Sequence, residues 1–514
     1  MSVETPVSRT SVKDLAAATP ASRDRYVDFL RALSIAVVVF GHWLMAIVFY
    51  DGSNVSGENA LEAIPGMWVL TWVLQVMPVF FFVGGFSNLV SLKAAYAKGS
   101  TPGSFVRSRV ERLMRPTIVF IGTWMVLAFV LEQVFDLGPA VAHATALIAK
   151  PVWFLAVYIL VVALAPMMLA LHERYGVRVP AAMVAGAMLV DVIRIGGGVE
   201  LVGYLNFAFV WLFVHQLGFF YADGSLTAFS RRFFAGAAVA SVATLVVLTN
   251  IGVYSRSMVG VTGDGVSNND PPSICLIFLT TWLVSVTMLA RGRVTAWLQK
   301  PRPWTAVIAA NSMIMTIFLW HLTALLVAVV TAYPLGFPQH EGGTTEWWLT
   351  RPLWLLVLTV ALVPLVVVFS KYERPRSTGA TGEPQRVSMI IGVALVVVGM
   401  AGFAQGGFAG LIGSEGTDLG LFVANPLLSA FHLTVGLVVL GSNRRGPLEL
   451  ASVALVALAA LEMIPLAPRI AEIVPVVPGN VMLHLASGLA LGLFLRDDRG
   501  DRVLARSSTA GSGT

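Results

Sequence analysis

Apolar runs of about 20 residues recur along nearly the whole chain, and they limit its possible folds more than any other feature. Each run is long enough to cross a bilayer as a helix. Hydrophobic residues make up 57% of the 514 positions, and charged residues make up only 12%. The sequence therefore predicts an all-α polytopic membrane protein.

We expect about fourteen transmembrane helices, ten before a charged break in the sequence and four after it. Their approximate ranges are 27–50, 65–92, 116–135, 151–171, 178–193, 201–221, 233–253, 272–290, 304–333, 351–370, 388–411, 421–441, 448–468 and 479–496. If the N-terminus is cytoplasmic, 29 of the chain's 34 Lys and Arg residues fall in cytoplasmic segments. This asymmetry predicts that both termini are inside.

The break is the segment KYERPRSTGATGEPQR, whose charged, Gly- and Pro-containing composition is typical of a linker. No obvious sequence repeat relates the two groups of spans. We therefore expect a cytoplasmic tail at 1–25, a membrane domain at 26–370, a cytoplasmic linker at 371–387, a four-helix membrane domain at 388–496 and a cytoplasmic tail at 497–514.

An ionisable residue, His42, lies deep in the first expected span. It follows Asp28 by fourteen residues, or about 21 Å along a helix, which places it beyond the bilayer midplane from the cytoplasmic side. Neutral imidazole can accept a proton near neutral pH, so one interpretation of His42 is a general base. The other interpretation is a histidine that hydrogen-bonds a neighbouring helix and only supports packing.

A regularly spaced arginine cluster precedes the third expected span. The segment FVRSRVERLMRP contains Arg109, Arg112 and Arg115 at intervals of three, which forms a stripe along one side of a helix, with Arg107 nearby. We take Pro116 as the residue that starts the following helix. Guanidinium groups bind phosphate oxygens in bidentate fashion, so a phosphate site is one interpretation. Positive-inside anchoring or contact with anionic lipid is the other.

Further polar residues lie within the expected spans. His321 lies midway along 304–333, a span so long that it must tilt or protrude. A cavity between spans would bring His321 next to His42, although spacing alone does not define that packing. His215 is expected to cap or bridge helices near the inner face.

Cysteine and net charge exclude other classes of site. The single Cys275 excludes an intrachain disulfide and gives no metal-site spacing, so we expect no metal and no bound cofactor. A net charge of +6 would suggest nucleic acid in a soluble protein. In a membrane chain the placement of the charges is the better guide, and we expect the lipid bilayer and no nucleic acid as partners.

These residues resemble a known family. The opening YVDFLRALSIAVVVFGH is similar to the signature of the acyltransferase 3 family of integral membrane acyltransferases, in which an acidic residue and an Arg precede a histidine in the first span. RSRVERLMRP resembles its R-x-x-R segment, VWFLAVYIL its aromatic fourth-span motif, and FLWHL its late aromatic-Leu-x-His pattern. The resemblance covers about residues 20–375. Ser34 stands where an alanine is frequent, and the extra Arg115 leaves open whether Arg109 and Arg112 or Arg112 and Arg115 form the functional pair.

The C-terminal spans resemble a second family. Residues 388–496 are similar to a four-span bacterial membrane domain of unknown function. The shared features are an Asn followed by His432 or His484 and then a Gly-rich helix. The two histidines could serve a site or only support helix packing.

The first resemblance implies transfer of an acyl group, often acetyl, from cytoplasmic acyl-CoA to a hydroxyl of a cell-envelope glycan, lipid or exported small molecule. The chain would then be a multi-pass protein of the bacterial cell membrane with acyl-CoA as donor substrate; its oligomeric state is not defined by the sequence. The roles implied are His42 as catalytic base, Arg109, Arg112 and Arg115 as phosphate ligands, and Asp28, Arg31, Trp153, Tyr158 and His321 as supporting residues. A covalent acyl-histidine intermediate is a variant of this mechanism.

The competing class is a secondary transporter of a small polar or lipidic solute. The segment LGFFYADGSLTAFSRR at 217–232 has a Gly…Asp-Gly…Arg-Arg pattern similar to a transporter loop signature. That signature belongs between the second and third spans of a repeated half, whereas here the segment follows the sixth span and has no duplicate. A non-catalytic partner or sensor is a third class, and it fits only the last four spans.

Overall fold

The computed structural model describes Ala16 and residues 18–20, 23–51, 55–260, 266–373, 385–413, 416–463 and 472–510. Most of the expected N-terminal tail and residues 374–384 of the expected linker lie outside this set. Among the described residues, 13 helical segments are long and apolar enough to cross a membrane, and Pro426–Gly441 is a shorter apolar helix. The prediction of an all-α polytopic membrane protein is confirmed, and each of the fourteen expected spans corresponds to one of these segments.

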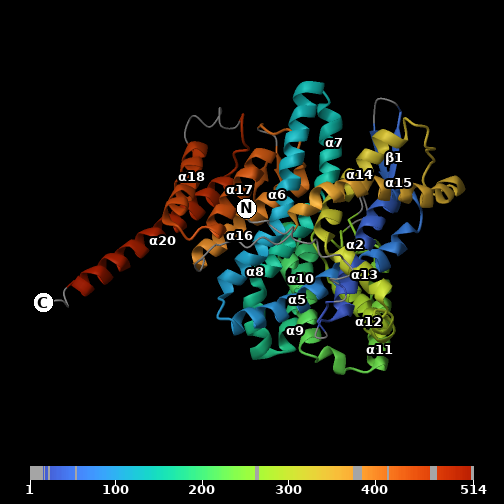
Figure 1. Ribbon diagram of the computed structural model, residues 1–514, viewed down its shortest axis with the longest axis horizontal. Helices are drawn as coiled ribbons and strands as arrows, with labels where there is room; N and C mark the ends of the chain where they lie inside the picture. The colour runs from blue at the N-terminus through green and yellow to red at the C-terminus, as the bar shows by residue number, and fades with distance from the viewer. Residues whose placement is uncertain are drawn as a thin grey trace, which may run out of the picture. The chain divides into compact units, whose positions relative to one another are not determined.

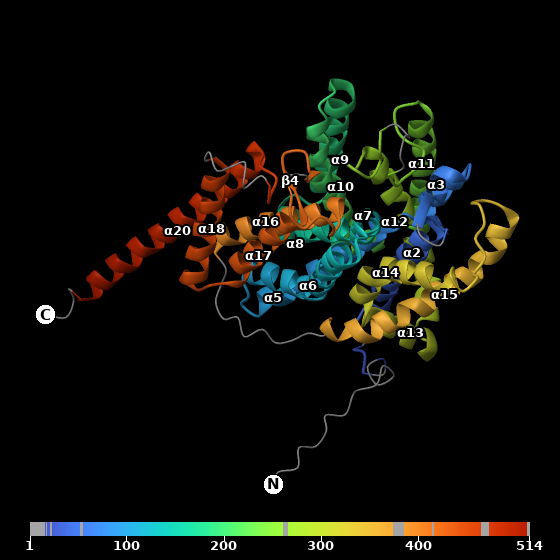
Figure 2. The ribbon, with the colours of Figure 1, turned by 90° about the horizontal axis from the view of Figure 1, so that it is seen from above.

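Contacts divide the chain into two compact units (Figures 1 and 2). Unit 1 comprises residues 1–91 and 167–373, and unit 2 comprises residues 92–166 and 374–514. The division falls inside two helices, α5 (Met77–Ala97) and α8 (Val152–Tyr175). Each unit is therefore described by itself.

In the described residues of unit 1 the regular elements are helices and one short hairpin, in which β1 pairs antiparallel with β2 directly after α2. Besides parts of α5 and α8, its elements are α2 (Arg25–Met45), β1 (Ala46–Tyr50), β2 (Val55–Asn59), α3 (Ala60–Ala63), η1 (Met67–Leu70), α4 (Thr71–Leu74), α9 (Arg178–Asp191), η2 (Val192–Gly196), η3 (Glu200–Leu205), α10 (Asn206–Ala222), η4 (Leu226–Ala228), α11 (Arg231–Asn250), α12 (Ile274–Trp297), α13 (Pro301–Asn311), α14 (Ile314–Ala332), α15 (Thr345–Phe369) and η5 (Ser370–Tyr372).

Unit 2 joins a central part of the chain to the C-terminal helices. Its elements, besides parts of α5 and α8, are α6 (Pro102–Phe135), α7 (Gly138–Ala149), α16 (Arg386–Gly406), β3 (Thr417–Asp418), β4 (Val423–Ala424), α17 (Pro426–Gly441), α18 (Arg445–Met463) and α20 (Pro478–Ala510). One apolar core of this unit comprises Ile391, Leu395, Val435, Val439, Leu448, Ala451, Leu455, Leu491 and Leu495.

Helix α15 illustrates how these helices meet both protein and lipid. Its buried face carries Trp347, Arg351, Trp354, Leu358 and Leu362. Its exposed face carries Leu349, Leu353, Leu356, Val360, Val363 and Val367, which are also apolar. A helix that is apolar on its exposed face is suited to a hydrocarbon surrounding and not to water.

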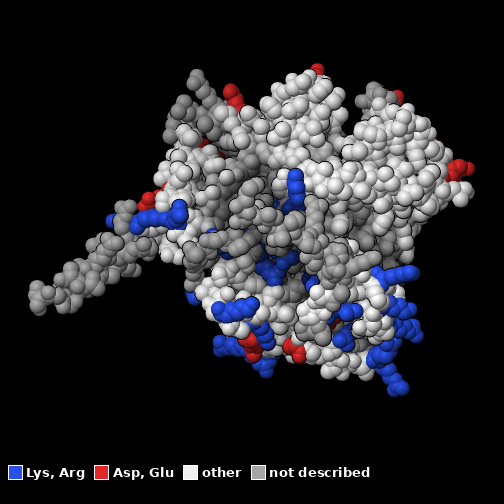
Figure 3. Space-filling model, in the orientation of Figure 1, with Lys and Arg blue, Asp and Glu red and all other residues white. Residues whose placement is uncertain are grey.

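Charged side chains of unit 1 are unevenly distributed. Figure 3 shows Lys and Arg gathered at the end of the molecule where α11 begins, and mostly uncharged atoms above it. Arg231 and Arg232 start α11, and Arg291 and Arg293 lie in the last two turns of α12. The positive-inside rule would place this end in the cytoplasm, and the N-in orientation stays a prediction.

Two expected helix boundaries are wrong. The expected span 304–333 is interrupted at Ser312 and Met313, because α14 starts as a new helix whose first backbone N–H groups bond to Glu373. The helix after the arginine cluster starts at Pro102 and not at Pro116, which lies inside it.

The early start of α6 has a local cause. The Thr101 Oγ1 accepts the Ser104 N–H at 3.3 Å, and the Ser104 Oγ accepts the Thr101 N–H at 3.1 Å. This capping box, followed by Pro102 at the first helical position, satisfies N–H groups that would otherwise lack partners.

Glycines allow close helix crossings within unit 1. A Cβ atom on Gly85 would collide with the backbone carbonyl of His215, and a Cβ atom on Gly218 would collide with the backbone of Phe82 and Phe86. Helices α5 and α10 therefore meet backbone to backbone, the contact that small residues permit in membranes.

Substitution of Gly218 tests this crossing. We expect Gly218→Val to lower the stability of the detergent-solubilised protein by about 1–3 kcal/mol, because the added side chain must push the two helices apart. The measurement is thermal unfolding. Gly236→Val on α11 is the matched control, since nothing lies within 4 Å of a Cβ there. Equal unfolding temperatures for the two variants would contradict the close crossing.

Candidate active site

The first helix of unit 1 is fixed at its start. The Asp24 carboxylate accepts the N–H groups of Tyr26 at 2.9 Å and Val27 at 3.1 Å, which is an N-cap. Its second oxygen accepts the hydroxyl of Tyr221 at 2.9 Å, and Arg291 donates to that hydroxyl. Helix α2 is therefore held against α10 and α12 where it begins.

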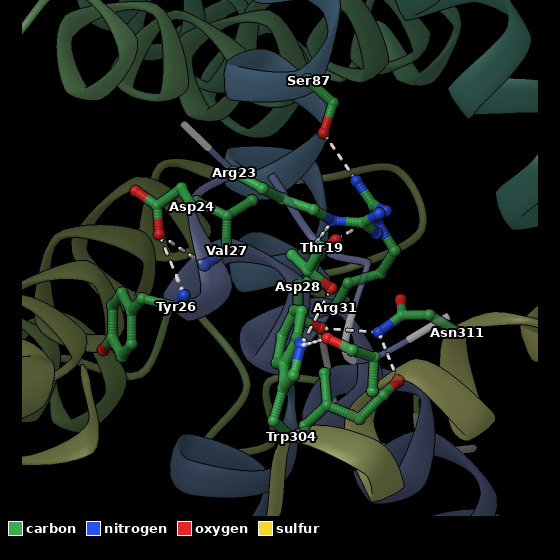
Figure 4. Close-up of polar contacts among 12 residues, drawn as sticks. Thr19, Arg23, Asp24, Tyr26, Val27, Asp28, Arg31, Ser87, Trp304 and Asn311 are labelled. Carbon is green, nitrogen blue, oxygen red and sulfur yellow. Dashed lines mark hydrogen bonds and ion pairs between the residues drawn. The ribbon is translucent and has the colours of Figure 1, made fainter. Parts of the chain in front are cut away.

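Asp28 and Arg31 form a polar cluster one turn further along α2 (Figure 4). Asp28 is only 6% exposed and lies 2.5 Å from the Arg23 Nε and 3.5 Å from an Arg31 guanidinium nitrogen. Arg31 also donates to the Ser87 Oγ at 2.6 Å. Asn311 donates its amide to the Asp28 carbonyl at 2.9 Å, which joins α13 to α2.

His42 lies in the last turn of α2 and meets His321 from α14. The His42 Nδ1 and the His321 Nε2 are 2.8 Å apart, and the two rings are nearly parallel with centroids 5.0 Å apart. His321 is completely buried, and His42 is half-buried. The Trp43 indole donates to the His321 carbonyl at 2.9 Å, which fixes α2 and α14 at this level. Residues 279 positions apart in sequence are thus brought together.

The partners of His321 determine which nitrogen atoms carry protons. The His321 Nδ1 is 2.6 Å from the Phe318 carbonyl oxygen, and a carbonyl can only accept, so this Nδ1 is the protonated nitrogen. In a neutral ring the His321 Nε2 is then an acceptor, and His42 donates to it through its own Nδ1–H. The remaining nitrogen of neutral His42, Nε2, is consequently a proton acceptor, as a general base requires.

Helix α14, which carries His321, has an unusual cap at its start. The two oxygens of Glu373 accept the backbone N–H groups of Met315 and Thr316 at 3.0 Å each, and the Thr316 hydroxyl at 2.9 Å. A carboxylate at a helix N-terminus satisfies orphan donors and interacts favourably with the helix dipole. This cap explains why the expected long span becomes two helices.

Arg351 lies close to the site and was missed by sequence reasoning. It is 9% exposed, stacks over the Trp347 ring at 4.0 Å, and donates to the Ala46 carbonyl, immediately after the turn that holds His42. Its position caps the C-terminal end of α2 with a cation. The signal that could have revealed it is an arginine within an apolar span, which is costly unless it has a role.

Two further histidines of unit 1, His215 and His172, bridge helices. Asn88 donates to the His215 Nε2 at 3.1 Å, which joins α5 to α10, as expected for His215. His172 accepts from Gln216 and donates to Asp223 at 2.9 Å. Although burial opposes ionisation of Asp223, hydrogen bonds from Ser225 and His172 lower the pKa of its carboxyl.

The arginine cluster belongs to unit 2 and lies within helix α6. Arg107 is buried, pairs with Glu111 at 2.9 Å, and donates to the carbonyl of Gly441, the last residue of α17, so it has a structural role. Arg112 is exposed. Arg109, which stacks on Phe105, and Arg115 are half-buried.

Trp153 and Tyr158 also belong to unit 2. Both lie on α8 and are half-buried, with Phe154 in aromatic contact with each at centroid distances of 6.3 and 5.8 Å. Of the residues predicted from sequence, Asp28, Arg31, His42 and His321 are therefore in unit 1. The arginines and the two aromatic residues are in unit 2.

The described residues contain no group of three or more His, Cys, Asp or Glu side chains that could hold a metal ion. The chemistry that the His42 site itself offers is proton transfer by imidazole, close to the buried cation Arg351 at the C-terminal end of α2.

Comparison with known families agrees with this reading. Residues 24–371 match the acyltransferase 3 family, whose model is described as an acyltransferase domain. Because the match covers more than half of the chain, the chain belongs to this family and is a membrane acyltransferase. Residues 385–495 match a domain of unknown function (DUF4383), so both resemblances seen in the sequence are confirmed. No curated protein and no solved structure matches the chain.

The cap on α14 can be tested through stability. We expect Glu373→Ala to lower the free energy of unfolding by about 1–2 kcal/mol, because backbone donors of α14 lose their acceptor. Glu373→Gln should lower the free energy of unfolding by less than Glu373→Ala, since the single amide oxygen of Gln can still accept a backbone N–H. Thermal unfolding of both variants is compared with Glu341→Ala, an exposed residue before α15. A loss that is no greater for Glu373→Ala than for this control would contradict the cap.

Proposed function

We propose that this acyltransferase moves an acyl group, most simply acetyl, from cytoplasmic acyl-CoA to a hydroxyl of a cell-envelope glycan, lipid or exported small molecule. We also propose that it acts in the bacterial cell membrane. The observation that carries the proposal is the Phe318–His321–His42 hydrogen-bond chain, which leaves the His42 Nε2 as a proton acceptor.

In the proposed reaction, the His42 Nε2 takes the proton of the acceptor hydroxyl while its oxygen attacks the thioester carbonyl. The tetrahedral intermediate then expels the CoA thiolate, and the imidazolium of His42 returns the proton to the sulfur. During the step the His42 Nδ1–H stays bonded to His321, which holds the ring in one tautomer and orientation. His321 therefore acts as a positioning residue.

We further propose that the arginine stripe binds the phosphates of acyl-CoA. Support comes from its position in the sequence near the expected cytoplasmic start of α6, and from guanidinium chemistry, which suits phosphate. Arg107 is left out of this set, because its side chain is used within unit 2. Asp28 and Arg31 would shape the cytoplasmic entrance, and Trp153 and Tyr158 would line the donor's path.

Substitution of the histidines tests the proposed base. We expect His42→Ala to lower acyl transfer by about 100- to 10,000-fold, the contribution typical of a general base. His321→Ala should lower the rate of acyl transfer by a smaller factor than His42→Ala, because the base remains but is no longer oriented. The measurement is transfer of labelled acyl groups from acyl-CoA to an envelope fraction.

Controls separate catalysis from folding and from transport. His143→Ala, which changes an exposed histidine on α7, should keep full activity. Full activity of His42→Ala would overturn the assignment of the base. Solute flux that continues without acyl-CoA would favour a transporter over an enzyme.

Kinetics on the arginines test donor binding. A hydrogen bond to a charged group contributes about 1.5–3 kcal/mol, so Gln at a phosphate-binding position should raise the KM for acyl-CoA by about 10- to 100-fold with little change in kcat. Comparing the double variants at Arg109 and Arg112 and at Arg112 and Arg115 identifies the functional pair. Arg107→Gln should lower stability without a comparable rise in KM. Unchanged KM for all stripe variants would assign the stripe to lipid anchoring.

A further inference from the structure

The C-terminal part of unit 2 contains a second buried polar cluster, formed by three helices. His432 of α17 and His484 of α20 each lie six residues into their helix, and Glu462 is the last residue but one of α18. The two histidines are completely buried and Glu462 is 4% exposed. The cluster is separate from the His42 site, which belongs to unit 1.

The three side chains form a hydrogen-bonded row. The His484 Nδ1 is 2.9 Å from a Glu462 oxygen, and the His484 Nε2 is 2.7 Å from the His432 Nε2. If Glu462 is ionised and both rings are neutral, His484 donates to the carboxylate and its Nε2 accepts the His432 Nε2–H. Within the part of the chain that the structure describes, two atoms then remain without a partner, the His432 Nδ1 at one end of the row and the Glu462 Oε1 at the other.

No described cation neutralises this row. On the four helices α16, α17, α18 and α20, the other titratable residues whose side chains the structure describes lie near the opposite helix ends: Arg386, Arg445, Glu449 and Arg496. Glu449, for example, is 13 residues from Glu462, or about 20 Å along the helix. The described titratable residues on elements near the cluster end of these helices are the exposed or half-buried Glu132, Asp136, His143, Lys150, Asp418 and Glu472.

The charge balance therefore favours an additional proton. With an ionised carboxylate and two neutral rings, the row would hold one negative charge that no described residue compensates, and such a charge within apolar helices is costly. One added proton makes the row neutral, whether the proton resides on an imidazole or on the carboxylate. Packing alone requires neither a charge nor two end atoms without partners.

We propose that Glu462, His484 and His432 form one proton-binding site, along which a proton passes between the His432 Nδ1 and the Glu462 carboxyl. A proton bound at the His432 Nδ1 releases the proton on its Nε2 to the His484 Nε2. His484 in turn releases its Nδ1 proton to the Glu462 carboxylate. One proton enters, two move between neighbours, and Glu462 ends as a neutral carboxylic acid, so the transfer balances.

A metal ion fits this geometry less well than a proton. Ligand nitrogen atoms lie about 2.0–2.1 Å from zinc, and zinc sites use at least three protein ligands. The two facing imidazole nitrogen atoms of the row are already at hydrogen-bond distance, and among the described residues no group of three or more His, Cys, Asp or Glu side chains is arranged to hold a metal ion.

Infrared difference spectroscopy of the full chain in lipid nanodiscs, between alkaline and acidic pH, tests the proposal. We expect a carboxylic-acid band from a buried group that shifts in heavy water, disappears in Glu462→Gln, and has a changed pH midpoint in His432→Gln. Potentiometric titration should show that Glu462→Gln binds about one proton fewer per chain. Glu449→Gln, at a half-buried position near the other end of the same helix, should leave the band unchanged.

Three results would overturn the proposal: a band that persists in Glu462→Gln, a midpoint that does not respond to His432→Gln, or a stoichiometric metal in the wild-type protein that is lost in that variant. If a variant does not fold, nuclear magnetic resonance of isotope-labelled histidine in the wild type provides the test. Two buried rings that titrate together support a shared site. Rings that titrate independently contradict it.

Discussion

The structure depends on one constraint, which is that apolar spans leave no water to satisfy polar groups. Helices meet this constraint along their length but not at their ends, where backbone donors lack partners. Several of the described helices therefore carry side-chain caps, among them Asp24 on α2, Thr101 on α6, Ser273 on α12 and Asn425 on α17. Helix α14 instead uses Glu373, which is distant in sequence.

The same constraint organises the polar side chains inside the units. A lone imidazole or carboxylate would be costly there, and each buried one is bonded to another polar group. Hydrogen bonding also determines the tautomer of a neutral histidine, because an acceptor bonded to one ring nitrogen makes that nitrogen the donor and leaves the other as an acceptor. The Phe318 carbonyl does this for His321 and, through it, for His42. The Glu462 carboxylate sets the tautomer of His484 in the same way, and His484 in turn sets that of His432.

Sequence reasoning predicted well what depends on local composition. Hydropathy located every span, and the motif around His42 and His321 identified the family. Sequence reasoning failed where a helix boundary depends on a residue that is distant in sequence. The interruption at Ser312 depends on Glu373, some 60 residues later. The start of α6 was missed although Thr101, Pro102 and Ser104 form a recognisable helix-start signal, because Pro116 was taken as the start instead.

Pairings across the chain could only be suggested. The contact of His42 with His321 was considered from sequence, but nothing in the spacing required it. The row at His432 was harder to foresee, since Glu462 stands near the end of an apolar run where a carboxylate usually meets solvent. Arg107 was grouped with the other arginines, but its burial and its bonds with Glu111 and the Gly441 carbonyl distinguish it.

Glu373 also bears on where the acyltransferase portion of the chain ends. The family match stops at residue 371, yet the carboxylate that holds the helix of His321 comes two positions later. A fragment trimmed to the match would lack an anchor for the very helix that orients the base. Sequence similarity ends the family match at residue 371, whereas the hydrogen bonds that hold the helix of His321 require the chain to continue to Glu373. In this protein the two boundaries therefore differ.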